Sequence, residues 1–335
     1  MKFSDPAFDI ETDFSVGINN CLFGLRRMVS GHDVDEDNTD DDRGAKLLAV
    51  RLDKRFLKII RGFCPSRKPT SGPQKPSQPG SVHRIPWVFK RPRFTIDGFS
   101  NSGIKQGKGG NCWWLAALGT IAHRQDIMER ICVARDEDAG VYGFVFYRDG
   151  GYVSTVVDDN VYLAEEDYSG SAYGSTRKRA NRHRSHKQSG SNALFFARCG
   201  NPNETWLPLL EKAYAKIHGD YQALDGGWAG TAIEDLTGGI TSTIACKAVL
   251  DKERLWREML DLGAKDGDFV YSLSTGPGKG HHSGLTPSHA YSVLSAVEVE
   301  SDQGGKVRLV QIRYFSTPQF ASLDSSAQSR GGRAE

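Results

Sequence analysis

Cys112 is the residue whose setting most clearly allows covalent chemistry. It stands at the predicted start of a helix and follows the glycine-rich segment 107–110. A cysteine hydrolase needs a thiolate, and a helix N-terminus favours one because its unpaired N–H groups and macrodipole stabilise negative charge. The glycines let the backbone turn tightly and allow a peptide substrate to approach it closely. The main-chain N–H of Cys112 and the side-chain amide of Gln106 could then both donate to a developing oxyanion.

His289 adds the support that a lone cysteine lacks, because a glycine-rich Cys-Trp sequence fits a buried structural thiol equally well. It lies far from Cys112 in the sequence, as expected for a base that folding brings close. The surrounding sequence predicts the imidazole at the first residue of a strand, on the rim of a sheet from which it can reach another lobe. Four other histidines are interpreted as ordinary hydrogen-bonded residues: His123, His218, His281 and His282.

A central buried helix is predicted to carry the cysteine. Residues 111–123 are apolar on nearly all sides, which indicates burial rather than one exposed face. Residues 142–163 predict two strands around an Asp-Gly-Gly turn. An amphipathic helix is predicted from Trp206 to a stop at Gly219.

A strand-rich second lobe is predicted to carry the histidine. A boundary falls near residues 237–239, followed by a helix around 252–262 and by strands within 268–274, 289–300 and 306–315. Two lobes suit a chain of 335 residues, because single cores stop growing below that length. We expect a first lobe over 82–238, with a polar insertion at 165–191, and a partial second lobe over 239–320.

Residues 1–81 are predicted to form a flexible acidic and Pro-rich arm. Seven acidic residues lie within 33–42 and five prolines within 65–79. The basic segment 43–63 has helical apolar spacing, which favours a short docking or unstructured arm over a membrane-surface helix. The insertion at 165–191 carries six Lys and Arg residues, and a solvated loop is preferred there over a nucleic-acid or nuclear-targeting patch. A disordered tail is expected at 321–335.

Composition and charge exclude several classes of protein. The chain has 43 basic and 41 acidic residues, a balance that argues against binding of nucleic acid by the whole protein. Asp5 and Asp9 interrupt the N-terminus where a secretory signal is apolar, and no segment predicts stable membrane insertion. The six dispersed cysteines form no Cys-x-x-Cys pair. Reduced thiols and a cytoplasmic location are therefore expected.

Four sequence blocks resemble signatures of the calpain family of intracellular cysteine endopeptidases, and they occur in calpain order. The blocks are 106–124, 154–163, 204–239 and 284–296, and the similarity looks closest to the fungal calpain-like branch. A papain-type enzyme would share Gly-x-Cys-Trp, but LLEKAYAKIHGDYQAL and Gly-Leu-x-x-x-His-Ala-Tyr-Ser are specific to calpains. The resemblance implies an α+β fold, a papain-like two-lobe protease core whose second lobe is incomplete.

The resemblance also implies roles for individual residues. Cys112 would be the nucleophile, His289 the general base and Gln106 the oxyanion-hole side chain. Asn111 replaces the Asp usually found just before the nucleophile, which reduces the charge near the site.

Activation by calcium is a further implication of the resemblance. The first-lobe ligands would be the carbonyls of Ile96 and Gly98 and the carboxylate of Glu204, which are hard oxygen donors. A fourth ligand position, normally Asp, is Gly103 here. We therefore expect Ca²⁺ as the cofactor, bound weakly.

The chain departs from the calpain pattern after His289. Calpains continue into Ile-Arg-Asn-Pro-Trp-Gly, where Asn orients the imidazole, whereas this chain has Tyr314 at the Asn position. The remainder of the second lobe, with its calcium ligands, is missing from the sequence. Gln311 and Asp302 are alternative groups that could orient the histidine.

The sequence therefore predicts a calcium-dependent cysteine endopeptidase that cleaves protein substrates through a thioester, with very low activity because the orienting Asn is absent. The alternative is a catalytically impaired calpain-like protein that acts as a binding or regulatory module. Nucleic-acid binding through residues 177–187 is a third hypothesis, which rests on charge alone. No feature of the sequence indicates an oligomeric state.

Overall fold

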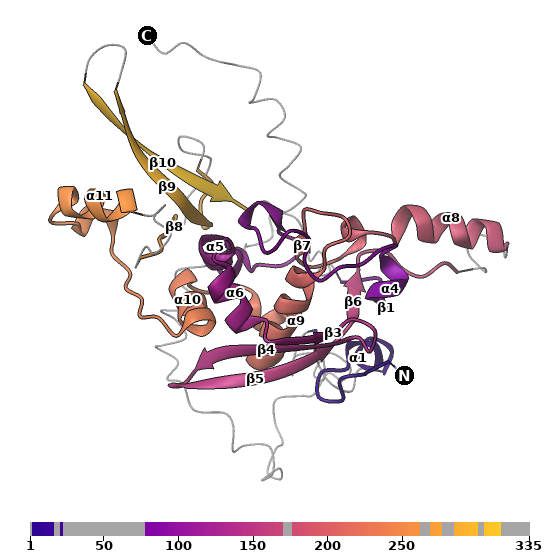
Figure 1. Cartoon of the computed structure of the whole chain (residues 1–335). Coiled ribbons are helices and arrows are strands. Elements are labelled where there is room, and N and C mark those ends of the chain that lie inside the picture. Colours follow the sequence, from indigo (N-terminus) through magenta and orange to yellow (C-terminus); the bar gives the residue numbers. More distant parts are fainter. Residues whose placement is uncertain are drawn as a thin grey trace, which may run out of the picture.

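The computed structural model describes the parts of the chain that carry the elements below (Figure 1). These are residues 2–16, 21–22, 78–169, 176–261, 269–276, 285–300 and 305–315. The acidic run at 33–42, the basic segment 43–63, most of the Pro-rich linker and the C-terminal tail lie outside these residues.

Helix α5 (Cys112–Ile121) is the central buried helix that the sequence predicts. All ten of its residues are buried, which suits a segment that is apolar on every side. Three further helices lie around it (Figure 1): α6 (Gln125–Ile131), α9 (Trp206–His218) and α10 (Ala229–Thr237). Trp114 of α5 stacks on Tyr214 of α9 with 5.4 Å between the ring centroids, so these two helices share an aromatic core.

A three-stranded antiparallel sheet packs against α9 and α10. Its strands, in spatial order, are β3 (Ala134–Asp136), β4 (Val141–Arg148) and β5 (Gly151–Asp158). Alternate residues of β4 are buried, including Tyr142, Phe144 and Phe146, because one face of the strand lies on the core. Asp149 and Gly150 join β4 to β5 with φ values of 52° and 85°, the left-handed pair that a tight hairpin favours. The predicted hairpin is confirmed.

Shorter elements make up other parts of the chain. They are β1 (Ser81–Arg84), α4 (Ile85–Val88), η1 (Asn101–Gly103), β2 (Ile104–Lys105), β6 (Asn160–Leu163), η2 (Ser191–Ala193), β7 (Arg198–Cys199), η3 (Gln222–Leu224) and η4 (Cys246–Ala248). β1 pairs with β6, and β2 pairs with β7. The β2–β7 pair joins the segment before α5 to the segment that leads into α9.

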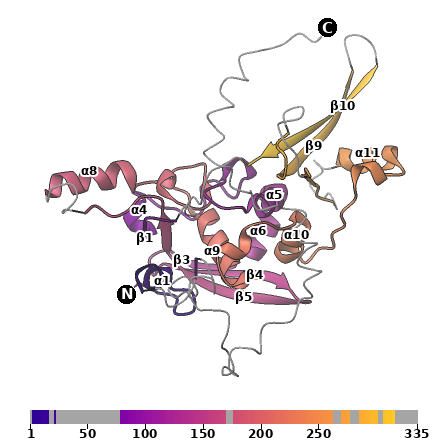
Figure 2. The ribbon, with the colours of Figure 1, turned by 180° about the vertical axis from the view of Figure 1, so that it is seen from behind.

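A smaller strand-rich part follows α10, as predicted. It contains α11 (Lys252–Leu260), β8 (Ser272–Ser274), β9 (Ala290–Glu300) and β10 (Lys306–Tyr314), with the strands in the order β10–β9–β8. Figure 2 shows α11 beside the β9–β10 hairpin. Trp256 of α11 makes the contact: its indole N–H donates to Glu298, and the Arg308 guanidinium lies 5.2 Å from its ring centroid.

These helices and separate antiparallel sheets confirm the predicted α+β class. The predicted lobe boundaries, 82–238 and 239–320, stay predictions. Among the described residues, no helix combines the length and the apolar composition that crossing a membrane requires.

The first residues of the chain differ from the flexible arm expected over 1–81. Helix α1 (Ile10–Val16) and the turn at 21–22 lie against the folded body. Phe8, Ile10 and Leu22 belong to the main hydrophobic core and are each at most 5% exposed. Burial of these apolar side chains stabilises the docked segment.

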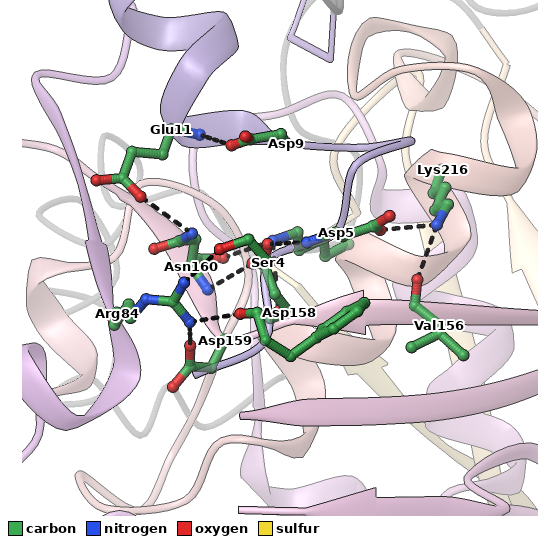
Figure 3. A network of polar contacts seen from close by, with 12 residues as sticks. Ser4, Asp5, Asp9, Glu11, Arg84, Val156, Asp158, Asp159, Asn160 and Lys216 are labelled. Atoms are coloured by element: carbon green, nitrogen blue, oxygen red, sulfur yellow. Dashed lines mark hydrogen bonds and ion pairs between the residues drawn. The ribbon is translucent and has the colours of Figure 1, made fainter. Parts of the chain in front are cut away.

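Charged side chains fix this N-terminal segment (Figure 3). The main-chain N–H of Asp5 donates to the Asp158 carboxylate at 2.8 Å, and the Asp5 carboxylate accepts from Lys216 at 2.7 Å. Arg84 donates to Asp159 at 2.6 Å. These charged residues, which the sequence alone would place at the solvent-exposed surface, therefore interact with one another within the folded chain.

Part of the polar insertion at 165–191 also differs from the expected loop. Residues Arg177–Lys187 form helix α8, which has no buried residue. Arg184 anchors it, since its guanidinium lies 4.3 Å from the ring centroid of Trp87 and donates to the Trp87 carbonyl at 2.6 Å. The other Lys and Arg residues of α8 are exposed, as a solvated insertion requires.

We predict that Lys212→Met lowers the free energy of unfolding by about 3–5 kcal/mol, because removing one partner leaves a buried charge uncompensated. Lys212 and Asp158 are fully buried and 2.6 Å apart, and Lys212 also donates to the Asn160 carbonyl. Chemical denaturation measures the change. Lys178→Met on exposed α8 is the control and should change stability by less than about 0.5 kcal/mol. Equal stability of the two variants would contradict the prediction.

Candidate active site

Cys112 is the first residue of α5, with Asn111 as the N-cap. The preceding nucleophile loop, residues 107–111, packs against the segment before β7, where the N–H of Lys108 donates to the Phe195 carbonyl at 2.8 Å. A side chain at Gly107 would overlap the Phe196 carbonyl, so the close approach requires glycine. The cysteine is 9% exposed at the positive end of the helix dipole.

Gln106 lies beside the nucleophile loop and is 4% exposed. Its side-chain amide donates to the Gly109 carbonyl at 2.8 Å, while its amide oxygen is buried without a hydrogen-bond partner among the described residues. A primary amide has two N–H groups. One of them fixes the loop, which leaves the second for another acceptor.

His289 directly precedes β9, one residue before the position expected for it. Thr275 fixes its main chain: the His289 N–H donates to the Thr275 hydroxyl at 3.1 Å, and the His289 carbonyl accepts from the Thr275 N–H at 2.9 Å. The residue before it, Ser288, has φ of 52°. The start of β9 is therefore held by Thr275, the residue that directly follows β8.

Aromatic rings surround the His289 imidazole. Its centroid lies 4.5 Å from the ring of Tyr314 and 5.3 Å from that of Tyr291, which are opposite each other on β10 and β9. Burial lowers the pKa of His289 to about 4, and a hydrogen bond with the main chain of Phe315 partly offsets this. At pH 7 the imidazole is consequently neutral. Its Nε2 is buried and has no hydrogen-bond partner in the described part of the chain.

The strand that follows His289 packs directly on the helix that begins with Cys112. The Ser292 hydroxyl of β9 donates to the Ala116 carbonyl of α5 at 2.7 Å. Gly119 makes this approach possible, because an added Cβ would overlap the Ser292 hydroxyl and lie 2.8 Å from the Phe315 ring. Arg313 adds a second link between the two parts, donating to the Ser102 carbonyl at 2.8 Å and the Ile104 carbonyl at 3.3 Å.

The predicted calcium ligands lie in one region of the first part. The N–H of Ile96 donates to the Glu204 carboxylate at 3.1 Å, and Gly98 follows two residues later with φ of 87°. A Cβ at Gly103 would lie 3.6 Å from the other Glu204 oxygen. Burial raises the pKa of Glu204, and Asp97 adds to this effect. Glu204 is the one carboxylate of the expected set, since position 103 is Gly, so this donor set fits calcium only in part. The described residues contain no group of three His, Cys, Asp or Glu able to hold a metal.

Two carboxylates behind the nucleophile loop were not singled out from the sequence. Asp225 accepts from the Gly110 N–H at 2.7 Å, and Glu211 of α9 accepts from the Asn111 amide. Burial raises the pKa of both carboxyl groups. The Asp-Gly-Gly sequence that begins at Asp225 marks a turn. Glu211 leaves no such signal, since a Glu within an amphipathic helix usually belongs to the solvated face.

Comparison with known proteins identifies the family. The family described as calpain family cysteine protease matches residues 65–315, well over half of the chain. The chain belongs to the calpain family of cysteine proteases. Its fold is therefore that of the papain-like calpain catalytic core, as the sequence resemblance implies.

Named relatives of this calpain-family chain come from animals and plants. Human calpain-9 is 30% identical over 273 residues, covering 74% of this chain and 36% of calpain-9. The calpain-type cysteine protease DEK1 of Zea mays is 33% identical over 64% of this chain and 9% of DEK1. DEK1 of Arabidopsis thaliana is 30% identical over 90% of this chain and 13% of DEK1. The chain thus spans about a third or less of these relatives, and a place in the fungal branch stays a prediction.

We predict that Gly103→Asp tightens calcium binding by about tenfold or more, because carboxylate number strongly tunes affinity for this ion. The new carboxylate would stand beside Glu204, whereas the parent chain should bind weakly. Titration calorimetry compares the two forms. Gly151→Asp is the matched control, since it adds the same charge where an added Cβ meets no atom within 4 Å. Equal affinity of all three chains would show that the calcium site lies elsewhere.

Proposed function

We propose that this chain is a calpain-type cysteine endopeptidase core, with Cys112 as nucleophile, His289 as general base and Gln106 as oxyanion donor. The observation that carries the proposal is the packing of β9 on α5, which brings together the segments bearing the cysteine and the histidine. Family membership supports the same reaction class.

The proposed reaction is acyl transfer from a peptide to the thiol. The neutral imidazole of His289 takes the Cys112 proton as the sulfur attacks the scissile carbonyl, and the N–H groups at the start of α5 stabilise the oxyanion. The C–N bond then breaks, and the leaving amine takes the proton from the imidazolium. Water, deprotonated by the imidazole, hydrolyses the thioester, and the thiolate leaves and regains the proton. Neither metal nor redox chemistry enters these steps.

The surroundings of the His289 imidazole support the proposal that catalysis by this chain is slow. A charged acceptor or an amide beside the ring would stabilise imidazolium, whereas Tyr314 offers an aromatic ring. The Phe315 main chain partly compensates, because its hydrogen bond with the ring raises the pKa of His289. Gln311 interacts instead with the Ser295 hydroxyl at 3.0 Å, and Asp302 lies outside the described residues. The second candidate, an impaired calpain-like binding module, is favoured by the same low histidine pKa.

We further propose that calcium, the general regulator of this family, acts weakly on this chain. The partial donor set around Glu204 supports this proposal. Calcium would act there by ordering the loop that contains Ile96 and Gly98, and it would not contact the substrate. Protein substrates and a cytoplasmic location belong to the same proposal. The cytosol keeps thiols reduced, so the location is supported by the cysteines of the described residues that form no disulfide: Cys21, Cys112, Cys132, Cys199 and Cys246.

We predict that Cys112 is the most reactive thiol, because a helix N-terminus favours thiolate. Burial raises the pKa of Cys21 to about 12 and also raises that of Cys132 and Cys199, so these thiols should stay inert. Competitive labelling with a thiol-directed epoxide at neutral pH, followed by peptide mapping, measures the order. Exposed Cys246 is the internal reference for accessibility. Preferential labelling of any thiol other than Cys112 would contradict the nucleophile assignment.

We predict that casein cleavage by the chain is very slow even with calcium, since disturbing the residue that orients the histidine costs about 10⁴ in rate in a serine protease. Tyr314→Asn should raise the rate by less than about tenfold, because the Phe315 main chain already contacts the imidazole. Cys112→Ser is the inactive control.

The two candidate functions separate in this assay. Cys112 labelling with turnover that Cys112→Ser abolishes supports the endopeptidase, whereas labelling without any turnover supports the binding module. Rapid cleavage by the unmodified chain would show that the environment of His289 allows efficient catalysis and that the predicted low activity is wrong.

A further inference from the structure

Asp225 carries a carboxyl group beside the nucleophile loop that the proposed mechanism does not use. It begins the Asp-Gly-Gly turn between η3 and α10, and the residue is exposed. Its Oδ1 accepts from the Gly110 N–H at 2.7 Å. A carboxylate has about four acceptor sites on its two oxygens. One hydrogen bond to the loop therefore leaves capacity for a further donor.

The turn that carries this carboxyl group is fixed on both sides of Cys112. Before the cysteine, the Gly110 carbonyl accepts from the Gly226 N–H at 3.0 Å. After the cysteine, the indole N–H of Trp113 donates to the Leu224 carbonyl at 2.9 Å. The residue between Leu224 and Gly226 is consequently held alongside the nucleophile.

Chain geometry limits the distance between the carboxyl group and the nucleophile. Gly110 precedes Cys112 by two residues, and two residues span at most about 7 Å. With the hydrogen bond to Gly110, the Asp225 Oδ1 lies within about 10 Å of the Cys112 nitrogen. An extended peptide advances about 3.3 Å per residue, and a Lys side chain adds a flexible four-carbon stem. A basic side chain close to the scissile bond can therefore reach this carboxylate.

No cation of the described residues forms an ion pair with Asp225. Lys108, which belongs to the nucleophile loop, lies over the Phe195 ring with its nitrogen 5.5 Å from the centroid. Burial raises the pKa of Asp220, and Asp225 adds to this effect, so the two acids lie in one negative region. Partial burial also raises the pKa of Asp225, and the Gly110 hydrogen bond lowers it. A cation brought beside Asp225 would favour its charged form.

We propose that Asp225 is a specificity-determining residue, which favours protein substrates with Lys or Arg within one residue of the scissile bond. The inference rests on the proposed role of Cys112 as nucleophile. The carboxylate would accept from an ammonium or guanidinium group while its bond to Gly110 stays in place. Substrates with Asp or Glu at the same position would be disfavoured, because like charges repel. The charge of Asp225, and not its hydrogen bond to the loop, would thus select the substrate.

Covalent peptide probes test this preference without requiring turnover. Two sets of peptidyl chloromethyl ketones carry a variable side chain, either at the ketone residue or one residue before it. Within each set this side chain is that of lysine, norleucine or glutamate, and the rest of the probe is identical. The Cys112 thiolate attacks the methylene carbon and chloride leaves, so the second-order rate constant reports peptide recognition by the folded full chain. Iodoacetamide, which contains no peptide, measures the reactivity of the thiol alone.

In one of the two sets, the parent chain should react with the lysine probe at least about threefold faster than with the norleucine probe, and slowest with the glutamate probe. Asp225→Asn should bring the lysine-to-norleucine ratio close to one, because its amide oxygen still accepts from Gly110 but carries no charge. Asp225→Glu keeps the charge and should keep the ratio above one. Asp149→Asn is the matched control: it removes an exposed carboxylate from the β4–β5 turn, and Asn tolerates the φ of 52° found there.

The outcomes separate the inference from the proposed function. A preference for lysine that Asp225→Asn removes and Asp149→Asn keeps supports the inference. A parent ratio near one in both sets, or a preference that Asp225→Asn leaves unchanged, overturns the inference alone when Cys112 reacts with iodoacetamide. If Asp225→Asn does not fold, Asp225→Ser takes its place and the same two outcomes apply. A Cys112 that reacts with neither the peptide probes nor iodoacetamide contradicts the proposed function and the inference together.

Discussion

The close packing of β9 on α5 is the contact on which the candidate active site depends. It requires a missing side chain at Gly119, where a methyl group would overlap the Ser292 hydroxyl and press on Phe315. Glycine within a helix costs about 1 kcal/mol relative to alanine. In a helix that is otherwise fully buried and apolar, that cost is offset by the direct bond from Ser292 to the Ala116 carbonyl. The same contact carries the histidine segment to the cysteine helix and allows Arg313 to reach the carbonyls of the neighbouring loop.

The sequence predicts those parts of the fold whose apolar residues follow a recognisable pattern. The central helix is apolar on every side, and β4 alternates between core and surface, so both could be predicted and both are confirmed. Helix α8 could not be predicted in this way, because it is polar all round and has no buried face. Arg184 anchors it by stacking on Trp87 and donating to the Trp87 carbonyl, and these two residues are far apart in the sequence.

Within the candidate site, the sequence reveals which side chains are present, but it does not reveal the contacts that main-chain groups make. The replacement of the expected Asn by Tyr314 is visible in the sequence, but the hydrogen bond that the Phe315 main chain makes with the imidazole is not. A main-chain group is present at every residue, so it leaves no signal of residue type. Glu211 was missed for a different reason. Its helix has an apolar face, and the burial of a carboxylate on the other side becomes visible only when the nucleophile loop folds over it.

The docking of the N-terminal segment has a consequence for the order in which the chain can fold. Asp5 pairs with Lys216, a partner 211 residues later, and Arg84 and Asp158 complete the same network. During synthesis Asp5 therefore leaves the ribosome long before its partner Lys216. Phe8 and Ile10 stay without their core neighbours while most of the first part is synthesised. Contacts of such long range slow folding and prolong the exposure of apolar surface. During that interval this chain would present the most apolar surface to a chaperone.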